Sequence, residues 1–331
     1  MRVNIFDARL AWQLLNGVFA VYKPPGVHVK KVRQTLMAHL CRDLNSMKVR
    51  PPINHVYIEG ETNKPMTVSV GPSYADHILV VGPRYQHEDL KLTSSNYLGS
   101  DASGILLCGV NSGNRIVHKI RESRPTSFYK IKGTLGQATD TFFITGKIIE
   151  KSSYKHVKRI MIDRICASMQ SSHQKKMFEL CGVDMQSQAA YELATKGPIR
   201  PADNNIPMIY AIKCIDFNSP EFTLEVVSIN ESLQYLQSLI HEIGIELHTT
   251  ATCTQVQCFK YGLFDIQLAL LKKYWNLENI LENMKLCKNF INKNKFIMRQ
   301  ENPSLVKPNL QVDGVVQYTK QVPKQVDHKV E

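Results

Sequence analysis

The stretch covering residues 97–109 constrains the fold more than any other part of the chain. It starts with small and turn-forming residues, among them Gly99 and Asp101, and then runs into an apolar segment at 105–108. Short apolar runs entered from glycine, serine and aspartate are typical of buried strands that follow a turn. We therefore expect a buried strand here and a helix from about Ser112. A loop leading into such a strand can hold one functional side chain rigidly at the floor of a binding site.

The chain carries a large excess of positive charge. Its 331 residues include 41 Lys and Arg against 29 Asp and Glu, which gives a formal net charge of +12. Because basic side chains neutralise phosphates and release counterions, this excess favours a polyanionic partner such as RNA. A basic protein without such a partner is the alternative, and proteins of the mitochondrial matrix are often basic too. The charge alone does not separate these classes.

The eight cysteines predict neither a metal site nor a disulfide framework. No two of them form a Cys-x-x-Cys pair, and Cys253 and Cys258 have no nearby Cys or His pair to complete a zinc set. Most lie in apolar runs, so we expect reduced core thiols in an intracellular protein. No apolar stretch approaches the length needed to span a bilayer, so we expect no membrane insertion.

Several short motifs resemble those of the TruB-type pseudouridine synthases. The matching positions are Lys23-Pro24-x-Gly26, Leu98, Ala102-Ser103-Gly104, Leu135-Gly136, Thr139-Asp140-Thr141, Tyr191-Glu192, and Tyr235, Leu239 and Gly244. The resemblance covers roughly residues 17–264 and is strongest to the mitochondrial branch of the family. It implies an α+β fold, a pseudouridine synthase-like catalytic domain with a mixed central β-sheet and flanking helices. It also implies conversion of uridine to pseudouridine in RNA, a reaction that needs no cofactor and no metal.

Two positions depart from the family's catalytic pattern. Gly99 stands where the family has its nucleophilic aspartate, and Gln237 stands where it has the arginine that pairs with that aspartate. Removing one member of a buried ion pair costs about 3–5 kcal/mol, whereas removing both is often nearly neutral. Joint loss is therefore what a stable but inactive scaffold should show. We predict an RNA-binding member of the family whose catalysis is impaired.

Asp101 offers an alternative, in which the chain is an active mitochondrial RNA pseudouridine synthase with a rearranged loop. Asp101 lies two residues beyond the lost nucleophile. In an extended segment two residues span about 6–7 Å. A displacement of about 1 Å can already cost a catalytic group roughly 100-fold in rate. Asp101 therefore serves as nucleophile only if the loop is reshaped.

The resemblance also implies which residues contact RNA. Tyr129 occupies the position of the tyrosine that stacks on the substrate base, although a lone strand tyrosine is ordinarily a half-buried packing residue. Basic residues near the motif strands are expected to contact phosphates: Lys23, Lys30, Lys31, Arg33 and Lys130. A protein-interaction scaffold that has lost RNA affinity is a third, less favoured interpretation, because Tyr129 and the basic charge are kept.

We divide the chain into three parts. Residues 1–16 form an N-terminal segment, either a weak mitochondrial targeting signal or a helix packed on the domain. Residues 17–290 form the TruB-like pseudouridine synthase domain, and residues 291–331 form a basic, largely disordered tail. From the resemblance, the expected location is the mitochondrial matrix. The expected partners are mitochondrial mRNA, tRNA or rRNA, with mitochondrial RNA-processing or ribosome-assembly proteins.

Overall fold

A mixed eight-stranded β-sheet forms the centre of the molecule. The computed structural model describes residues 7–47, 54–73, 78–195, 199–200 and 206–295. The sheet has the strand order β1-β5-β11-β6-β10-β9, with β12 paired to β11 and β4 paired to β5. Its strands are β1 (Gly17–Lys23), β4 (Leu92–Ser94), β5 (Ala102–Val110), β6 (Ser127–Leu135), β9 (Met208–Asn218), β10 (Glu221–Ile229), β11 (Ala251–Tyr261) and β12 (Phe264–Asp265). The predicted α+β class with a mixed central sheet is confirmed.

The strand β5 is the most deeply buried element of this sheet. All nine of its residues are buried, as expected for the apolar run at 105–108. It pairs antiparallel with β1, and parallel with β11 over a short stretch in which Ala102 lies opposite Val256. This parallel pairing of β5 with β11 makes the sheet mixed, and it joins two halves whose other strands pair antiparallel. The loop before β5 therefore ends at the seam between the halves.

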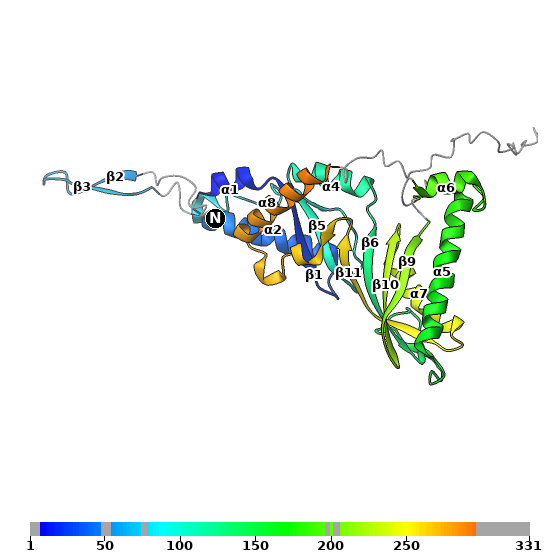
Figure 1. Ribbon diagram of the computed structural model, residues 1–331. Helices are drawn as coiled ribbons and strands as arrows, with labels where there is room; N and C mark the ends of the chain where they lie inside the picture. Colours follow the sequence, from blue (N-terminus) through cyan, green and yellow to red (C-terminus); the bar gives the residue numbers. More distant parts are fainter. Residues whose placement is uncertain (1–6, 48–53, 74–77, 196–198, 201–205, 296–331) are drawn as a thin grey trace, which may run out of the picture.

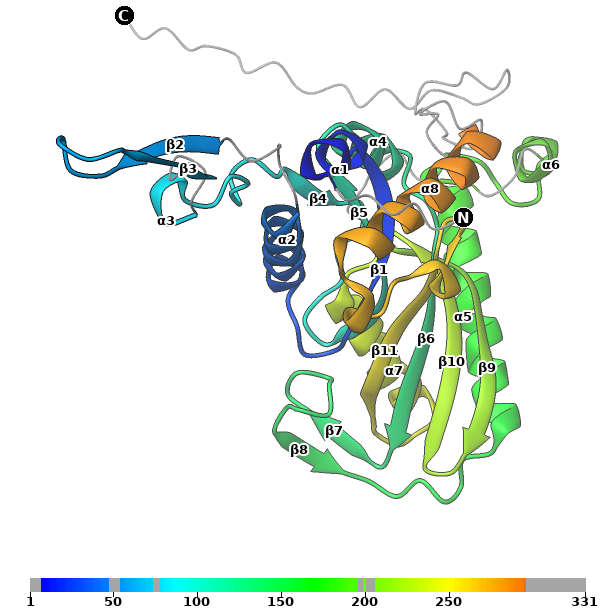
Figure 2. The same cartoon turned by 90° about the vertical axis from the view of Figure 1, so that its left-hand side faces the viewer.

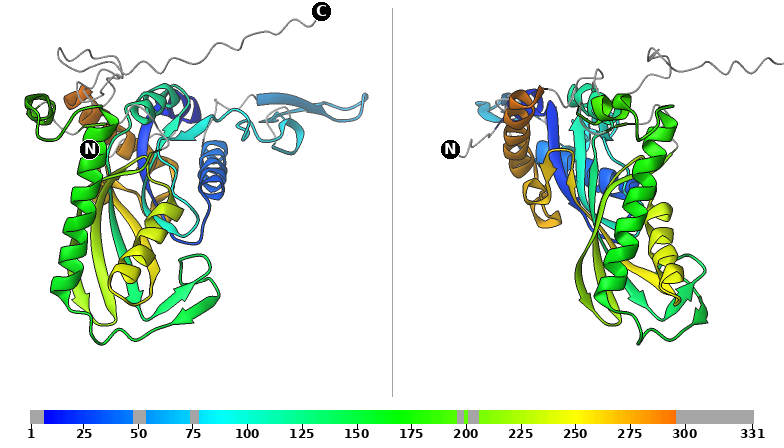
Figure 3. Two further views of the ribbon diagram at one scale, coloured as in Figure 1. Left: turned by 90° about the vertical axis from the view of Figure 1, so that its right-hand side faces the viewer. Right: turned by 45° about the vertical axis from the view of Figure 1, so that its right-hand side comes forward.

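Helices cover the two halves of the sheet differently. Figure 1 shows α1, α2, α4 and α8 around the half that contains β1 and β5. The other half, β11-β6-β10-β9, is covered on one face by α5 and α7, as the left panel of Figure 3 shows. The helices are α1 (Ala8–Leu14), α2 (Val29–Ser46), α3 (Ile78–Val81), α4 (Gly113–Glu122), α5 (Arg159–Leu180), α6 (Gln188–Thr195), α7 (Leu233–Glu246) and α8 (Leu277–Lys293).

Short elements complete the described part of the chain. Two hairpins, β2 (Asn54–Glu59) with β3 (Thr67–Pro72) and β7 (Gln137–Thr139) with β8 (Ile148–Lys151), are separate from the main sheet, and the first projects away from the body in Figure 1. Two 3₁₀ turns, η2 (Ile266–Leu268) and η3 (Lys272–Tyr274), precede α8. Within the N-terminal segment, Ala8 and Ala11 of α1 are buried, so this helix packs on the domain. The predicted tail lies almost entirely outside the described residues.

The side chains of strand β6 point alternately to the two faces of the sheet. Its burial alternates along the strand: Tyr129 is buried, whereas Phe128 is half-buried and Lys130 is exposed. Since successive strand residues point to opposite faces, Tyr129 faces α7 and its two neighbours face away from it. The period-two pattern expected for this segment is confirmed.

Three further expectations, about cysteines, metal ligands and membrane-spanning helices, bear on the described residues. All eight cysteines are free thiols, and seven of them are buried. Among the described residues, no group of three or more His, Cys, Asp or Glu side chains lies together as metal ligands do. No helix in the described part of the chain is long and apolar enough to cross a bilayer.

Candidate functional site

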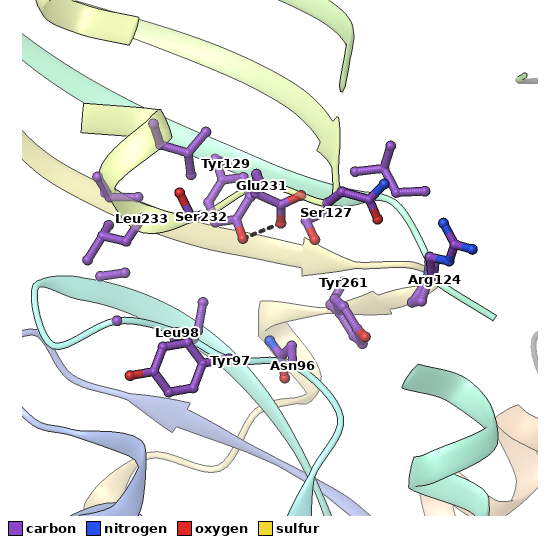
Figure 4. Close-up of a pocket in the computed structure, with 17 residues that line it drawn as sticks. Asn96, Tyr97, Leu98, Arg124, Ser127, Tyr129, Glu231, Ser232, Leu233 and Tyr261 are labelled. Atoms are coloured by element: carbon purple, nitrogen blue, oxygen red, sulfur yellow. Dashed lines mark hydrogen bonds between the residues drawn. The ribbon is translucent and has the colours of Figure 1, made fainter. Parts of the chain in front are cut away.

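A cavity of about 310 Å³ opens beside the loop that precedes β5. Loop, strand and helix residues meet there, with β6 and β11 on one side and the start of α7 on another (Figure 4). The lining residues are Asn96, Tyr97, Leu98, Gly99, Ala102, Arg124, Pro125, Ser127, Tyr129, Ile229, Asn230, Glu231, Ser232, Leu233, Leu236, Val256 and Tyr261. Its size lies at the lower end of the range for small-molecule sites, and it combines apolar walls with a few polar groups.

Tyr129 and Glu231 form the central polar pair of this cavity. The Tyr129 hydroxyl donates a 2.7 Å hydrogen bond to Oε1 of Glu231 (Figure 4). Burial, reinforced by the nearby Glu231 carboxylate, holds the pKa of Tyr129 well above its usual value, so the hydroxyl stays protonated and donates. The predicted stacking residue therefore lines the cavity, and its hydroxyl is already hydrogen-bonded to Glu231.

Sequence reasoning missed Glu231. The residue lies in the turn between β10 and α7, directly before Ser232, whose side chain accepts from the Tyr235 amide and caps the helix. An acidic residue beside a helix N-terminus is ordinarily explained by the helix dipole alone. The strand pairing that places Val226 opposite Tyr129, and so brings the end of β10 to the tyrosine, is not visible in the sequence.

Leu233 fills the space beside Gly99, the position that the resemblance assigns to the nucleophile. A Cβ atom built on Gly99 would overlap Leu233 Cδ2 and would lie 3.1 Å from Leu233 Cβ and 3.2 Å from its Cγ. Real Cβ atoms almost never approach another atom so closely. The loop therefore fits against α7 only because Gly99 has no side chain. The position that the resemblance assigns to the aspartate has no carboxylate, and a side chain there would require Leu233 to move.

Gln237 lies one helical turn beyond Leu233. Residues four apart on a helix are neighbours, about 5–6 Å between Cβ atoms, so Gln237 is on the helix face that meets the loop. Its side chain is buried, and no described group accepts a hydrogen bond from its Nε2. A buried donor without a partner costs about 1–3 kcal/mol. The structure thus brings the Gly99 loop and the Gln237 helix together and leaves an unmatched donor on that helix.

Asp101 does not line the cavity. It is half-buried and accepts a 3.3 Å hydrogen bond from the Ser100 hydroxyl. Its charge acts on the Lys23 ammonium, whose pKa it raises against the stronger effect of burial. Its position therefore gives no support to its expected role as a substitute nucleophile.

Lys23 is buried, contrary to its expected contact with a phosphate. Its Nζ donates to the carbonyl oxygens of Pro24 at 3.2 Å, Ser100 at 3.0 Å and Ala102 at 2.5 Å. All three ammonium hydrogens are therefore used inside the protein, and the side chain is not exposed to solvent in this structure. Lys23 instead ties the end of β1 to the loop before β5.

The other predicted RNA contacts are divided between two surfaces. Lys30 and Lys31 are exposed in the first turn of α2, and the Gly26 amide just before that helix donates to the Ser100 carbonyl. They therefore lie near the loop. Arg33 is half-buried, and its Nε has no hydrogen-bond partner among the described residues. Lys130 is exposed on the sheet face away from α7, so it does not belong to the cavity.

Replacing Gln237 with methionine is expected to stabilise the protein by about 1 kcal/mol. The change keeps the side-chain volume and removes the unmatched buried donor, which costs about 1–3 kcal/mol. At about 2–4 °C per kcal/mol, the melting temperature should rise by a few degrees. Calorimetry measures this, with the exposed Gln234→Met on the same helix as matched control. A fall in melting temperature for Gln237→Met alone would show that the amide is bound in solution.

Comparison with known proteins agrees with this architecture. Residues 91–232 match the TruB family pseudouridylate synthase (N terminal domain). The chain is 39% identical over 284 residues to pseudouridylate synthase TRUB2, mitochondrial, of Xenopus tropicalis. The aligned region covers 84% of this chain and 87% of the relative. The chain therefore belongs to the TruB family of pseudouridylate synthases.

The chain is also similar to two further proteins. The human protein pseudouridylate synthase TRUB2, mitochondrial, is 40% identical over 278 residues, covering 82% of this chain and 83% of the relative. In three dimensions the chain is similar to the archaeal box H/ACA sRNP Nop10–Cbf5 complex, with a TM-score of 0.44 and 12% identity over 88% of this chain and 60% of that chain.

Proposed function

We propose that this chain is a mitochondrial RNA-binding protein of the TruB family that keeps a nucleobase cavity and has lost most or all catalysis. The observation that carries the proposal is Gly99 itself, which has no carboxylate and against which the side chain of Leu233 packs in the structure. The mitochondrial location is supported by the names of the relatives at about 40% identity. The proposed RNA partners are mitochondrial mRNA, tRNA or rRNA, with RNA-processing or ribosome-assembly proteins around them.

The chemistry explains why the loss of one carboxylate matters. Pseudouridine formation breaks the N-glycosidic bond of uridine and rejoins the same base to the sugar through carbon, so no atom is gained or lost. In the TruB family a carboxylate acts on the nucleoside, and an arginine keeps that carboxylate ionised and oriented. Glycine at 99 supplies no such group, and the neutral amide of Gln237 supplies no positive charge.

Base binding has more support than catalysis. A base taken out of a stack needs a small pocket with an aromatic wall and a few polar partners. The cavity beside Gly99 offers Tyr129, Tyr261 and the carboxylate of Glu231. The net charge of +12 supplies the general attraction to a polyanion.

Glu231 keeps a second candidate function open, that of a working pseudouridine synthase with a relocated carboxylate. It is an acidic residue inside the cavity, which Asp101 is not. Its Oε1 is held by the Tyr129 hydroxyl, so the group has a fixed position. An active chain would use Glu231 on this geometry, or Asp101 if the loop rearranges when RNA binds.

A tritium-release assay on RNA containing 5-tritiated uridine separates these functions. We expect no release above the buffer blank from the wild-type protein, with an active TruB-family enzyme on the same RNA as positive control. Release that is abolished by Glu231→Gln would instead identify Glu231 as the catalytic carboxylate, and release abolished by Asp101→Asn would identify Asp101. Glu225→Gln, on the opposite face of the sheet, is the matched control for both variants.

A further inference from the structure

One face of the β11-β6-β10-β9 sheet is not covered by any helix of the residues that the structure describes. Figure 2 shows this face toward the viewer, with α5 and α7 behind the strands, and the left panel of Figure 3 shows those helices in front. Ten side chains of β6, β10 and β11 in this uncovered layer are half-buried or exposed: Phe128, Lys130, Lys132, Thr223, Glu225, Val227, Gln255, Gln257, Phe259 and Lys260. We call these ten residues the outer face.

A β-bulge concentrates aromatic and basic groups on the outer face. The pairing of β11 with β6 shifts register between Cys258 and Lys260, so Phe259 is an extra residue opposite β6. Bulges re-aim side chains at such points. As a result the consecutive residues Phe259 and Lys260 both reach the outer face, where Phe128 and Lys130 already lie on the neighbouring strand.

The two phenylalanines and two of the lysines form crossed contacts. The rings of Phe128 and Phe259 lie edge to face, with centroids 6.1 Å apart at 63°. Lys260 Nζ lies 5.1 Å from the centre of the Phe128 ring, and Lys130 Nζ lies 6.0 Å from that of Phe259. Each lysine thus rests on the aromatic ring of the other strand. The rings do not belong to the buried core clusters of the described residues.

The ten residues of the outer face carry a net positive charge, from Lys130, Lys132 and Lys260 against Glu225. Glu225 is the acidic residue among these ten, and it forms a 3.4 Å ion pair with Lys213 of β9. Glu221 of β10 and Asp216 of β9 lie farther along the same sheet face, away from the two phenylalanines. Lys130, Lys132 and Lys260 form no ion pair with a described residue, so three cations stand beside two aromatic rings. Open antiparallel sheets with aromatic side chains on central strands are one of the common platforms on which proteins stack single-stranded RNA.

We propose that the outer face binds single-stranded RNA, with Phe128 and Phe259 stacking on bases and Lys130, Lys132 and Lys260 contacting phosphates. The energies favour replacing the lysine on each ring with a stacked RNA base. A lysine over an exposed ring contributes about 0.5–1 kcal/mol, whereas stacking a base on an aromatic side chain contributes about 1–3 kcal/mol. A base therefore displaces the ammonium from each ring, and the released lysine is then next to the backbone of the bound strand.

This surface is separate from the cavity. Tyr129 points to the α7 side of β6, and its neighbours on both sides point to the outer face. The two sites therefore respond to different substitutions, and RNA binding by the outer face does not depend on whether the cavity holds a base or performs chemistry. RNA binding by the outer face also gives Lys130 a phosphate-binding role, although Lys130 does not line the cavity.

The test is fluorescence anisotropy with a fluorescein-labelled 12-nucleotide oligouridylate and a 12-base-pair RNA duplex. The double variant Phe128→Leu with Phe259→Leu keeps apolar volume and removes the aromatic rings. It should bind the single strand at least about tenfold more weakly than wild type, since two stacked bases are lost. Its affinity for the duplex should change less than about twofold, because paired bases are not available for stacking.

The lysines and controls complete the experiment. Lys130→Gln with Lys260→Gln should lower the slope of log affinity against log salt by about 1.4, at about 0.7 per contact with a single strand. Lys175→Gln with Lys176→Gln, two exposed positions on α5, should leave both the single-strand affinity and its salt dependence as in the wild type. Restoring aromatic rings with Phe128→Tyr and Phe259→Tyr should restore binding. The proposal is overturned if the folded leucine variant binds the single strand as wild type does, which would leave this face to a protein partner. It is also overturned if single strand and duplex lose affinity equally.

Discussion

The triple variant Gly99→Asp, Leu233→Ala, Gln237→Arg is expected to release tritium from 5-tritiated uridine RNA at least about a thousandfold faster than the wild-type chain. Loss of a catalytic nucleophile can remove about six decades of rate in an enzyme, and groups that act as a unit are far from additive. The three changes supply a carboxylate, the space that Leu233 now fills, and a cation one helical turn away. The expected gain of about a thousandfold is thus about half, on a logarithmic scale, of the rate that loss of a nucleophile can remove.

Partial restorations should fail for different physical reasons. In Gly99→Asp alone the new Cβ overlaps Leu233, and the new carboxylate has no cation beside it. In Gln237→Arg alone a buried guanidinium has no partner, which costs about 3–5 kcal/mol. The pair Gly99→Asp with Gln237→Arg still meets Leu233, so it should be well below the triple variant.

The matched control replaces the aspartate with asparagine. Gly99→Asn, Leu233→Ala, Gln237→Arg has the same volume at each position and lacks the ionised carboxylate. It should be folded and inactive. If the aspartate triple variant is also inactive while its melting temperature and RNA affinity match those of the control, then the cavity has lost more than these three groups, and the assignment of Gly99 to the nucleophile position is in doubt.

The regular elements of the site could be predicted from the sequence. The apolar run at 105–108 became the fully buried β5, and the alternating pattern around Tyr129 became β6. The apolar stripe beginning near Leu233 became α7, with Ser232 as its cap. Each of these depends on residue order within one segment, which a sequence displays directly.

Contacts between segments could not be predicted in the same way. Leu233 looked like an ordinary core leucine, because its contact with Gly99 depends on how a loop meets a helix 134 positions later in the chain. Glu231 was missed because only the β10–β6 register brings it to Tyr129. Lys23 looked like a surface charge, since lysines are seldom buried unless their hydrogen bonds are satisfied, and the three carbonyls that satisfy them come from backbone.

Lys23→Met is the stability prediction with the largest expected effect, a loss of about 3 kcal/mol. The variant leaves the buried carbonyl oxygens of Pro24, Ser100 and Ala102 without a donor, at about 1–3 kcal/mol each, and removing the cost of the buried charge offsets part of this loss. The melting temperature should fall by about 6–12 °C, at about 2–4 °C per kcal/mol. Lys30→Met, an exposed lysine seven residues later, should change stability by less than about 0.5 kcal/mol. Equal effects at Lys23 and Lys30 would contradict the buried role.

The pH dependence of this loss gives an independent test of the buried lysine. Burial lowers the pKa of Lys23 to about 8, against 10.5 for an ordinary lysine, and the nearby Asp101 charge only partly opposes this. Between those two values the unfolded chain binds more protons at this position than the folded chain, so stability increases with pH. Urea unfolding should therefore show the stability of wild type relative to Lys23→Met as level below about pH 8 and rising from there toward pH 10.5. A relative stability that falls over this window would mean that the three carbonyls hold the proton more strongly than burial expels it, and that the folded pKa lies above that of a free lysine.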